Sequence, residues 1–179
     1  MQGTKLNLGC GTDIREGWIN LDIAPLKGVD VVHNIEKLPL PFEDNQFDEI
    51  LCNDVLEHVE YIPLLKDLHR ILKSKGVLTI QVPHFSSVDN YVDPTHKKRF
   101  SFRTFEYFIN DAAYQRTYYF DFHFSALKSA HISFRKKFYI YNILVEPVVN
   151  LFKATKLIYE NTFLVALLPA HNIIVKLVK

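Results

Sequence analysis

The sequence has little of several features that define common protein classes. Among its 179 residues are only two cysteines, and the formal net charge is +1. Two cysteines in apolar surroundings are a poor basis for a disulfide framework, so we expect a reducing compartment such as the cytoplasm. The near balance of charge provides no strong field to attract nucleic acid or an anionic membrane.

The sequence also lacks a membrane span and a secretion signal. Near the C-terminus, the longest stretch without Asp, Glu, Lys or Arg runs from Asn161 to Val175 and is interrupted by Pro169. It is shorter than the roughly 20 residues that a spanning helix needs. The first residues lead directly into an apolar strand pattern, with no basic and apolar leader before it. We therefore expect a cytoplasmic protein with no transmembrane segment, although the basic residues 135–137 before an apolar run leave peripheral membrane association as an alternative.

The most informative motif lies near the N-terminus, where the apolar pattern Lys5–Leu8 leads into Gly9-Cys10-Gly11. Two glycines one residue apart let the backbone turn sharply and lie close to a ligand. A second strand pattern, Trp18–Leu21, ends in Asp22, whose carboxylate can accept hydrogen bonds from both hydroxyls of a ribose. The third glycine of a dinucleotide fingerprint is missing, so no phosphate cradle is implied. The pattern predicts a nucleoside site.

Three further landmarks follow in order: Asn34-Ile35 after the strand pattern Val29–His33, the segment Leu38–Asp48, and Asp54-Val55-Leu56-Glu57-His58. With the glycine motif, they resemble class I S-adenosylmethionine-dependent methyltransferases of the type 11 branch. The resemblance covers Lys5 to about Phe105. It implies S-adenosylmethionine as the cofactor and an α/β, three-layer Rossmann-like methyltransferase fold, with a mostly parallel sheet and an antiparallel C-terminal strand.

The order of elements agrees with that fold, since alternating strands and helices indicate a parallel sheet covered on both faces. The length suits a single domain, 1–179. We expect strands at 5–8, 18–21, 29–33, 47–52, 77–82, 118–124 and 170–178, and helices at 61–72, 103–110 and 149–168. Lys75-Gly76 should end the first of these helices. The first crossover, Gly9 to Gly17, has nine residues, fewer than the roughly 10 to 12 that a parallel crossover needs, so its helix must be reduced.

The resemblance also implies roles for residues at the cofactor. Gly9, Cys10 and Gly11 would pass beneath the methionine part, Asp22 would hold the ribose, Ile23 would flank the adenine, Asn34 and Ile35 would bind the adenine edge, and Asn53 would face the sulfonium. Asn34 and Asn53 have an alternative reading as loop caps. Asn7 stands where the family more commonly has an acid, which raises the question of how firmly the glycine loop is ordered.

Candidate residues for the acceptor side are a cluster of histidines and carboxylates: Asp54, Glu57, His58, His84, Asp93 and His96. Methyl transfer is an in-line displacement, so the protein must position a nucleophile and, for a hydroxyl acceptor, remove its proton. A histidine suits that proton transfer, and we expect His84 or His96 as the base, with Asp93 as an orienting partner. Each also has a structural reading, as a packed residue or as part of a turn. No motif with metal-ligand spacing appears, so no metal site is expected.

We interpret the sequence as a methyltransferase that acts on an oxygen, less readily a nitrogen, of a small molecule or a glycan or polysaccharide precursor. DNA base methylation is disfavoured because the fourth strand ends in Cys52-Asn53-Asp54 instead of a Pro-Pro-aromatic sequence. Two alternatives remain: a non-catalytic regulatory module that binds S-adenosylmethionine or S-adenosylhomocysteine, and an enzyme acting on RNA or a lipid-associated substrate through basic residues such as Lys97, Lys98 and Arg99. The aromatic segment 118–124, as an edge strand, also suggests a homodimer.

Overall fold

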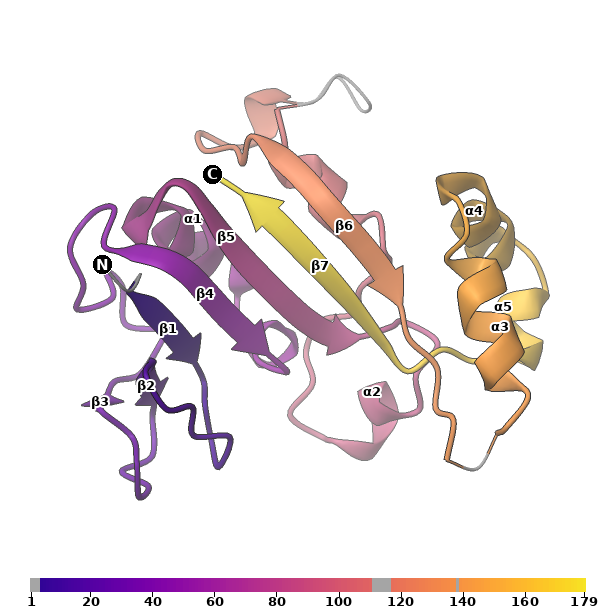
Figure 1. The fold of residues 1–179 in the computed structure, drawn as a ribbon, viewed down its shortest axis with the longest axis horizontal. Helices are drawn as coiled ribbons and strands as arrows, with labels where there is room; N and C mark the ends of the chain where they lie inside the picture. The colour runs from indigo at the N-terminus through magenta and orange to yellow at the C-terminus, as the bar shows by residue number, and fades with distance from the viewer. Residues whose placement is uncertain (1–3, 111–116, 138) are drawn as a thin grey trace.

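The computed structural model describes residues 4–110, 117–137 and 139–179. Its centre is a seven-stranded sheet of order β3-β2-β1-β4-β5-β7-β6 (Figure 1). The strands are β1 (Lys5–Leu8), β2 (Ile19–Asp22), β3 (Val31–Val32), β4 (Phe47–Asn53), β5 (Leu72–Pro83), β6 (Ala126–Ile132) and β7 (Asn172–Val178). Strands β1 to β5 are parallel to one another, whereas β7 is antiparallel to both β5 and β6. The predicted α/β sheet, mostly parallel with an antiparallel C-terminal strand, is confirmed.

The helices are short apart from α1. They are η1 (Leu56–His58), α1 (Tyr61–Ile71), α2 (Asp89–Val92), η2 (Thr104–Phe108), η3 (Thr117–Tyr119), α3 (Asn142–Val149), α4 (Lys153–Asn161) and α5 (Leu164–Leu167), where η denotes a 3₁₀ helix. Helix α1 buries Leu64, Leu65, Leu68 and Ile71, which share one helical face as their spacing predicts. None of the described helices has the length and apolar character that a transmembrane span requires.

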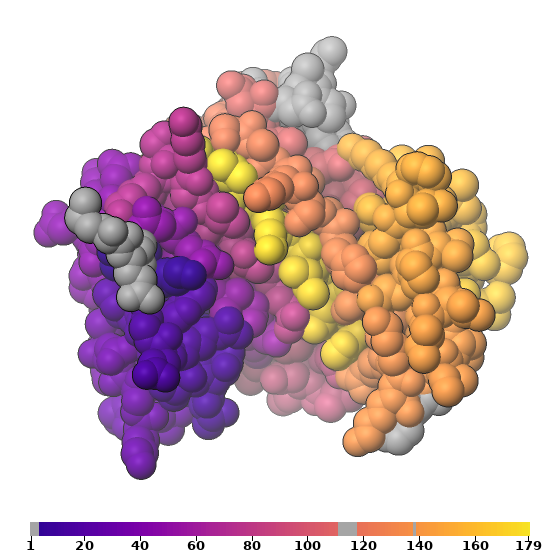
Figure 2. Space-filling view, viewed as in Figure 1, coloured from indigo at the N-terminus to yellow at the C-terminus, as the bar shows by residue number. Residues whose placement is uncertain are grey.

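Within the described residues, helices cover one face of the sheet and extend past its β6 edge. In β4, the alternate residues Ile50 and Cys52 are fully buried, whereas Glu49 and Asn53 are half-exposed. Figure 1 is viewed onto the second face, over which no labelled helix lies, and in Figure 2 atoms of β7 reach the surface there. Polar contacts such as the Lys5–Glu49 ion pair (2.9 Å) keep this face compatible with water. The expected helical layer on this side is therefore not present in the described part of the chain.

Two asparagines fasten the first crossover in place of a helix. The Asn7 amide donates to the Asp13 carbonyl (2.6 Å) and to Asn20 Oδ1 (3.1 Å), and that oxygen also accepts the Arg15 N–H (2.9 Å). Asn7 and Asn20 are only 2% and 3% exposed. The crossover is thus a turn, as its length predicts, and Asn7 orders it although the commoner acid is absent.

Several element boundaries differ from the predictions. Strand β5 begins at Leu72, directly after α1, so Lys75-Gly76 is an irregularity inside a long strand and does not end the helix. Lys75 has φ 64° and donates its N–H to the Lys179 carbonyl (2.9 Å), which explains the deviation. The predicted helix 149–168 is divided into α4 and α5, after α3, and strand β6 has no counterpart among the predictions.

The strand predicted at 118–124 is also wrong. The described part of this segment forms only the 3₁₀ turn η3 and an isolated bridge between Phe124 and Ile109. The alternation reflects packing, because Phe122 and Phe124 are buried while Tyr118 and Tyr119 are exposed. The suggestion of a homodimer through an aromatic edge strand loses its basis.

Candidate functional site

Two adjoining cavities lie where the parallel strands end, the edge at which such sheets bind ligands. The nucleoside pocket, of about 300 Å³, is lined by Gly9, Asp22, Ile23, His33, Asn34, Ile35, Glu36, Asp54, Val55, His58 and Val59. The histidine pocket, of about 410 Å³, is lined by Asp54, Glu57, His58, Gln81, Pro83, Asp89, Val92, Asp93, His96, His171 and Asn172. The two pockets share Asp54 and His58, so ligands bound in them would meet there.

The glycine loop shapes the nucleoside pocket. Gly9 has φ 65°, and a Cβ at this position would lie 2.4 Å from Val55 Cγ2. Both the conformation and the close approach therefore require glycine. Gly11 has φ 49° with open space around it, and its N–H donates to Asp22 Oδ2 (2.8 Å). The loop is thus tied to the carboxylate that the sequence predicts at the ribose.

Asp22 is held in a fixed orientation at the end of β2. Its Oδ1 accepts the Ala24 N–H (2.9 Å) and its Oδ2 accepts the Gly11 N–H. Each carboxylate oxygen has a further lone pair, so both can still accept a hydroxyl hydrogen. Ile23 follows with a side chain 65% exposed, which leaves it free to contact a ring in the pocket.

The remaining predicted cofactor residues divide into two groups. Asn34 and Ile35 line the pocket, and Asn34 Oδ1 also caps its turn by accepting the Glu36 N–H (2.9 Å). Cys10 and Asn53 are not among the lining residues of either pocket. Cys10 is buried, and its N–H donates to the Leu21 carbonyl (3.0 Å).

Asp54, one residue after Asn53, occupies the junction of the two pockets. It has φ 53°, its N–H donates to the Gln81 carbonyl (2.9 Å), and its Oδ2 accepts the Gln81 side-chain amide (3.0 Å). Burial raises the pKa of the Asp54 carboxyl. Asp54, and not its predicted neighbour Asn53, therefore lines the junction of the two pockets.

The loop after α2 brings His96 against η1. The backbone carbonyl of Glu57 accepts the N–H groups of Lys97 (2.7 Å) and Lys98 (3.1 Å). His96 Nε2 consequently lies 4.0 Å from Glu57 Oε1 and 3.7 Å from Asp93 Oδ2. The predicted pair His96 and Asp93 is brought together in the histidine pocket.

His58 belongs to the same cluster. Its ring centroid lies 4.7 Å from that of His96, and its Nδ1 is 2.9 Å from Thr95 Oγ1. Thr95 in turn donates to Asp93 Oδ1 (2.6 Å), and this bond, with a second from the Thr95 N–H, lowers the pKa of Asp93. Burial and the neighbouring His96 lower the pKa of His58. At neutral pH, His58 is therefore a neutral imidazole.

Glu57 is the least expected member of this cluster. Its side chain is fully buried, and neither carboxylate oxygen has a hydrogen-bond partner among the described residues. Burial raises the pKa of Glu57 to about 8, with Asp54 and Asp93 acting in the same direction. Buried polar groups are normally paired, so this carboxyl needs an explanation.

His84, the other predicted base, lies outside both pockets. It is fully buried, with Nδ1 2.8 Å from Ser86 Oγ and Nε2 3.0 Å from Glu160 Oε1 on α4. Both ring nitrogens are thus used to fasten α4 to the end of β5. The structure assigns His84 a structural role, and we do not retain it as a base.

His171 lines the histidine pocket, although it is not among the candidate residues from the sequence. Its Nε2 is 3.2 Å from Asp89 Oδ2. Because β7 is antiparallel, its first residue Asn172 pairs with Pro83, the last residue of β5. An antiparallel final strand is predicted from the sequence. That prediction could have indicated that His171, which directly precedes the strand, lies at the edge where the parallel strands end.

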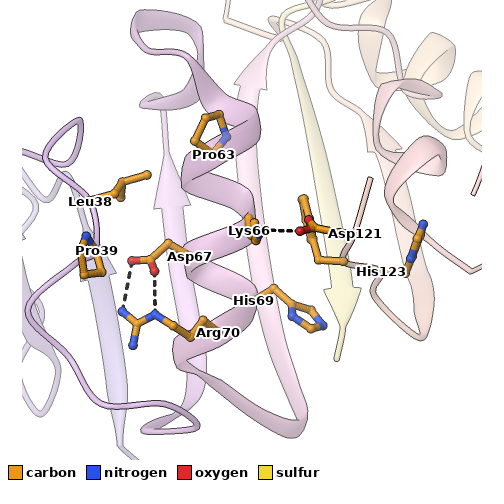
Figure 3. Close-up of a pocket in the computed structure, with 10 residues that line it drawn as sticks. Leu38, Pro39, Pro63, Lys66, Asp67, His69, Arg70, Asp121 and His123 are labelled. Atoms are coloured by element: carbon orange, nitrogen blue, oxygen red, sulfur yellow. Dashed lines mark hydrogen bonds and ion pairs between the residues drawn. The ribbon is translucent and has the colours of Figure 1, made fainter. Parts of the chain in front are cut away.

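A larger cavity, of about 760 Å³, lies elsewhere, along α1. Figure 3 shows that its charged side chains pair with one another: Asp67 with Arg70 (2.6 Å) and Lys66 with Asp121. None of the residues predicted for cofactor or catalysis lines it. We therefore place the functional site at the two smaller pockets.

Parts of the chain match known proteins in sequence. Residues 9–80 match the family model described as a methyltransferase domain. An uncharacterized protein of Methanocaldococcus jannaschii is 51% identical over 51 residues, which are 28% of this chain and 23% of that protein. The match thus spans about a quarter of the curated relative.

Solved structures resemble the chain over nearly its whole length. A SAM-dependent methyltransferase from Archaeoglobus fulgidus has a TM-score of 0.59 and 17% identity, covering 98% of this chain and 86% of that one. The YcgJ protein of Bacillus subtilis has a TM-score of 0.60 and 13% identity, covering 99% and 92%. These likenesses show the fold. Residues 9–80 thus resemble a methyltransferase domain in sequence, and the chain as a whole resembles a methyltransferase in fold.

Proposed function

We propose that this chain, whose motifs and fold are those of a class I S-adenosylmethionine-dependent methyltransferase of the type 11 branch, methylates an oxygen of a small molecule or a glycan precursor. The cofactor would occupy the nucleoside pocket and the acceptor the histidine pocket. One observation carries the proposal: the pockets meet at Asp54 and His58, at the carboxyl edge of the sheet. Such a junction brings a donor and an acceptor into contact, as an in-line displacement requires.

The nucleoside pocket offers suitable contacts for each part of the cofactor. Asp22 accepts hydrogen bonds from the ribose hydroxyls, while Ile23 and Ile35 provide apolar contacts for the adenine. The backbone at Gly9 lies beneath the methionine part, where no Cβ obstructs it. Asp54 at the junction places a carboxylate near the sulfonium, and opposite charges attract.

The transfer step follows from the groups in the histidine pocket. The acceptor hydroxyl oxygen attacks the methyl carbon, a C–O bond forms, and the C–S bond breaks, leaving its electron pair on sulfur in S-adenosylhomocysteine. His96 takes the hydroxyl proton. Asp93, whose Oδ2 is 3.7 Å from His96 Nε2, orients the imidazole.

A second candidate is methylation of an amine. Four carboxyl groups line the histidine pocket, Asp54, Glu57, Asp89 and Asp93, and they would attract a cationic acceptor. An RNA or phospholipid acceptor is less well supported, because Lys98 pairs with Glu60 (2.6 Å) and Lys97 approaches Glu36 (3.9 Å). Two of the three basic residues that suggested an anionic partner thus pair with carboxylates of the chain itself.

The first test is a calorimetric titration with S-adenosylhomocysteine. The intact protein should bind one equivalent, and Asp22→Ala should abolish binding. Asp13→Ala is the matched control, because Asp13 is an exposed carboxylate of the same loop that pairs with Arg15 (2.9 Å). If the intact, folded protein does not bind, the cofactor assignment is wrong.

A second measurement separates an enzyme from a non-catalytic binding module. His96→Asn should retain cofactor affinity and lose transfer of a labelled methyl group to hydroxyl acceptors. Amine and hydroxyl acceptors are screened in parallel, so that the preferred atom is read directly. Transfer by His96→Asn at the rate of the intact protein would exclude His96 as the base.

A further inference from the structure

We propose that Glu57, His58 and His96 form a binding site for a divalent transition metal in the wall of the histidine pocket. Each residue offers one donor atom, and these atoms all lie within 4.8 Å of one another. Two imidazoles and one carboxylate are a donor set that binds first-row metals. No spacing motif in the sequence indicates it, because His96 is distant in sequence from the adjacent pair.

Glu57 and His96 have buried side chains with atoms that lack a hydrogen-bond partner, which is the independent evidence for a ligand. Glu57 is 0% exposed, and neither of its carboxylate oxygens has a hydrogen-bond partner within the described part of the chain. The His96 side chain is 8% exposed, and its Nδ1 also has no hydrogen-bond partner there. A buried carboxylate with no compensating contact is costly, and a bound cation would supply that contact.

The surrounding residues orient the imidazole of His58. Its Nδ1 is 2.9 Å from Thr95 Oγ1, and Thr95 donates to Asp93 Oδ1 (2.6 Å). A histidine that binds a metal usually donates its second ring N–H to such a partner, which fixes the tautomer and the ring orientation. This arrangement leaves Nε2 of His58 for the metal.

The donor set and charge indicate which cation fits. Imidazole suits zinc, iron, cobalt and nickel, whereas magnesium and calcium prefer oxygen ligands. Asp54 and Asp93 line the same pocket as Glu57, so negative charge is available to balance a dication. We therefore expect selectivity for ions such as Zn²⁺ or Co²⁺ over Mg²⁺.

The role of the metal rests on the proposed function, whereas its binding does not. An acceptor oxygen in the histidine pocket would complete the coordination, and its proton would leave more readily. His96 would then be a ligand and could not take that proton, which would pass to the Asp93 carboxylate. Activation by the metal and activation by the His96 imidazole are thus alternatives, and the metal requires that the protein bind a transition-metal ion.

The experiment is a titration of chelator-treated, full-length protein with Co²⁺, followed by the visible absorption of the bound ion, with Mg²⁺ present as a competitor. We expect one saturable equivalent, and about 100-fold weaker binding in Glu57→Gln and in His96→Ala. Thr95→Val should weaken binding about tenfold through His58. His131→Ala is the matched control, because it removes a histidine that pairs with a glutamate, Glu146 (3.1 Å), elsewhere. Its affinity should be unchanged.

Three results would overturn the site: no saturable Co²⁺ binding by the folded protein, unchanged affinity in both ligand variants, or equal loss in His131→Ala. Circular dichroism verifies that each variant is folded, and Glu57→Gln keeps the side-chain volume. Titration with S-adenosylhomocysteine on the same samples reports the cofactor separately. Metal binding without cofactor binding would reject the proposed function alone, and the reverse would reject the metal site alone.

Discussion

Gly9→Ala tests the packing at the floor of the nucleoside pocket. The native φ of 65° costs an alanine about 1 kcal/mol. The new Cβ would also lie 2.4 Å from Val55 Cγ2, well inside van der Waals contact, and overpacking of this kind costs about 1–3 kcal/mol. We expect a total loss of about 2–4 kcal/mol in the free energy of unfolding, measured by urea denaturation.

Gly11→Ala provides the matched comparison. Gly11 also has a positive φ, 49°, but a Cβ there meets nothing within 4 Å. Gly11→Ala should lower the free energy of unfolding only by the conformational cost of the positive φ, about 1 kcal/mol. The difference between the two variants therefore measures the contact with Val55.

The contact can be isolated by removing its other partner. In a Val55→Ala background, Gly9→Ala should cost only the conformational part, about 1 kcal/mol. The two substitutions should therefore show a favourable coupling of about 1–3 kcal/mol in the free energy of unfolding. Equal losses for the two glycine variants, or a coupling energy of zero, would refute the reasoning. Affinity for S-adenosylhomocysteine should fall in Gly9→Ala, because Gly9 and Val55 both line the pocket.

Three further predictions follow from the fold. Asn20→Ala should lower the free energy of unfolding by about 2–3 kcal/mol, because it leaves buried backbone groups of the crossover unpaired; equal stability by urea denaturation would contradict this. Burial raises the pKa of Glu160, but hydrogen bonds led by that from His84 lower it more, so its net pKa is depressed. The stability it contributes is present above the ordinary pKa of 4.5 and is lost as the pH falls through the lower folded value, so acid titrations of Glu160→Gln should show a shallower decline. Burial raises the pKa of both thiols, Cys10 and Cys52, so neither should react with a thiol reagent until the protein unfolds; rapid modification of the native protein would count against their burial.

The positions of the first parallel strands could be predicted from the sequence because each is a largely apolar run that ends in a polar or glycine residue. Gly9, Asp22 and Asn34 lie at one edge because these strands run in the same direction. His84 shows the limit of such a prediction. It directly follows the last residue of β5, as a site residue would, yet its Nε2 is hydrogen-bonded to Glu160, 76 residues later. A contact of that sequence separation leaves no local pattern.

The segment around Phe122 shows a second limit. Alternating aromatic residues indicate a strand when the alternate side chains face a sheet. Here Phe122 and Phe124 pack beside His69 of α1, with ring centroids 6.0 and 5.2 Å away, and the backbone need not be extended. Burial on one side is common to both arrangements, so the sequence predicts the buried face and not the backbone.

The crossover between β1 and β2 makes cofactor binding and local order a single equilibrium. The residues of this crossover are held by turns and two asparagine side chains, so they can open at low cost without unfolding the sheet. A ligand that bridges Gly9, Asp22 and Asn34 must restrain all of these turns at once. Amide hydrogens of the turns at residues 9–18 and 23–30 should exchange quickly in the free protein and slow together on binding, whereas those of β5 and β7 should not change. Because no helix orders the crossover between β1 and β2, a bound ligand would supply part of the stability of this segment.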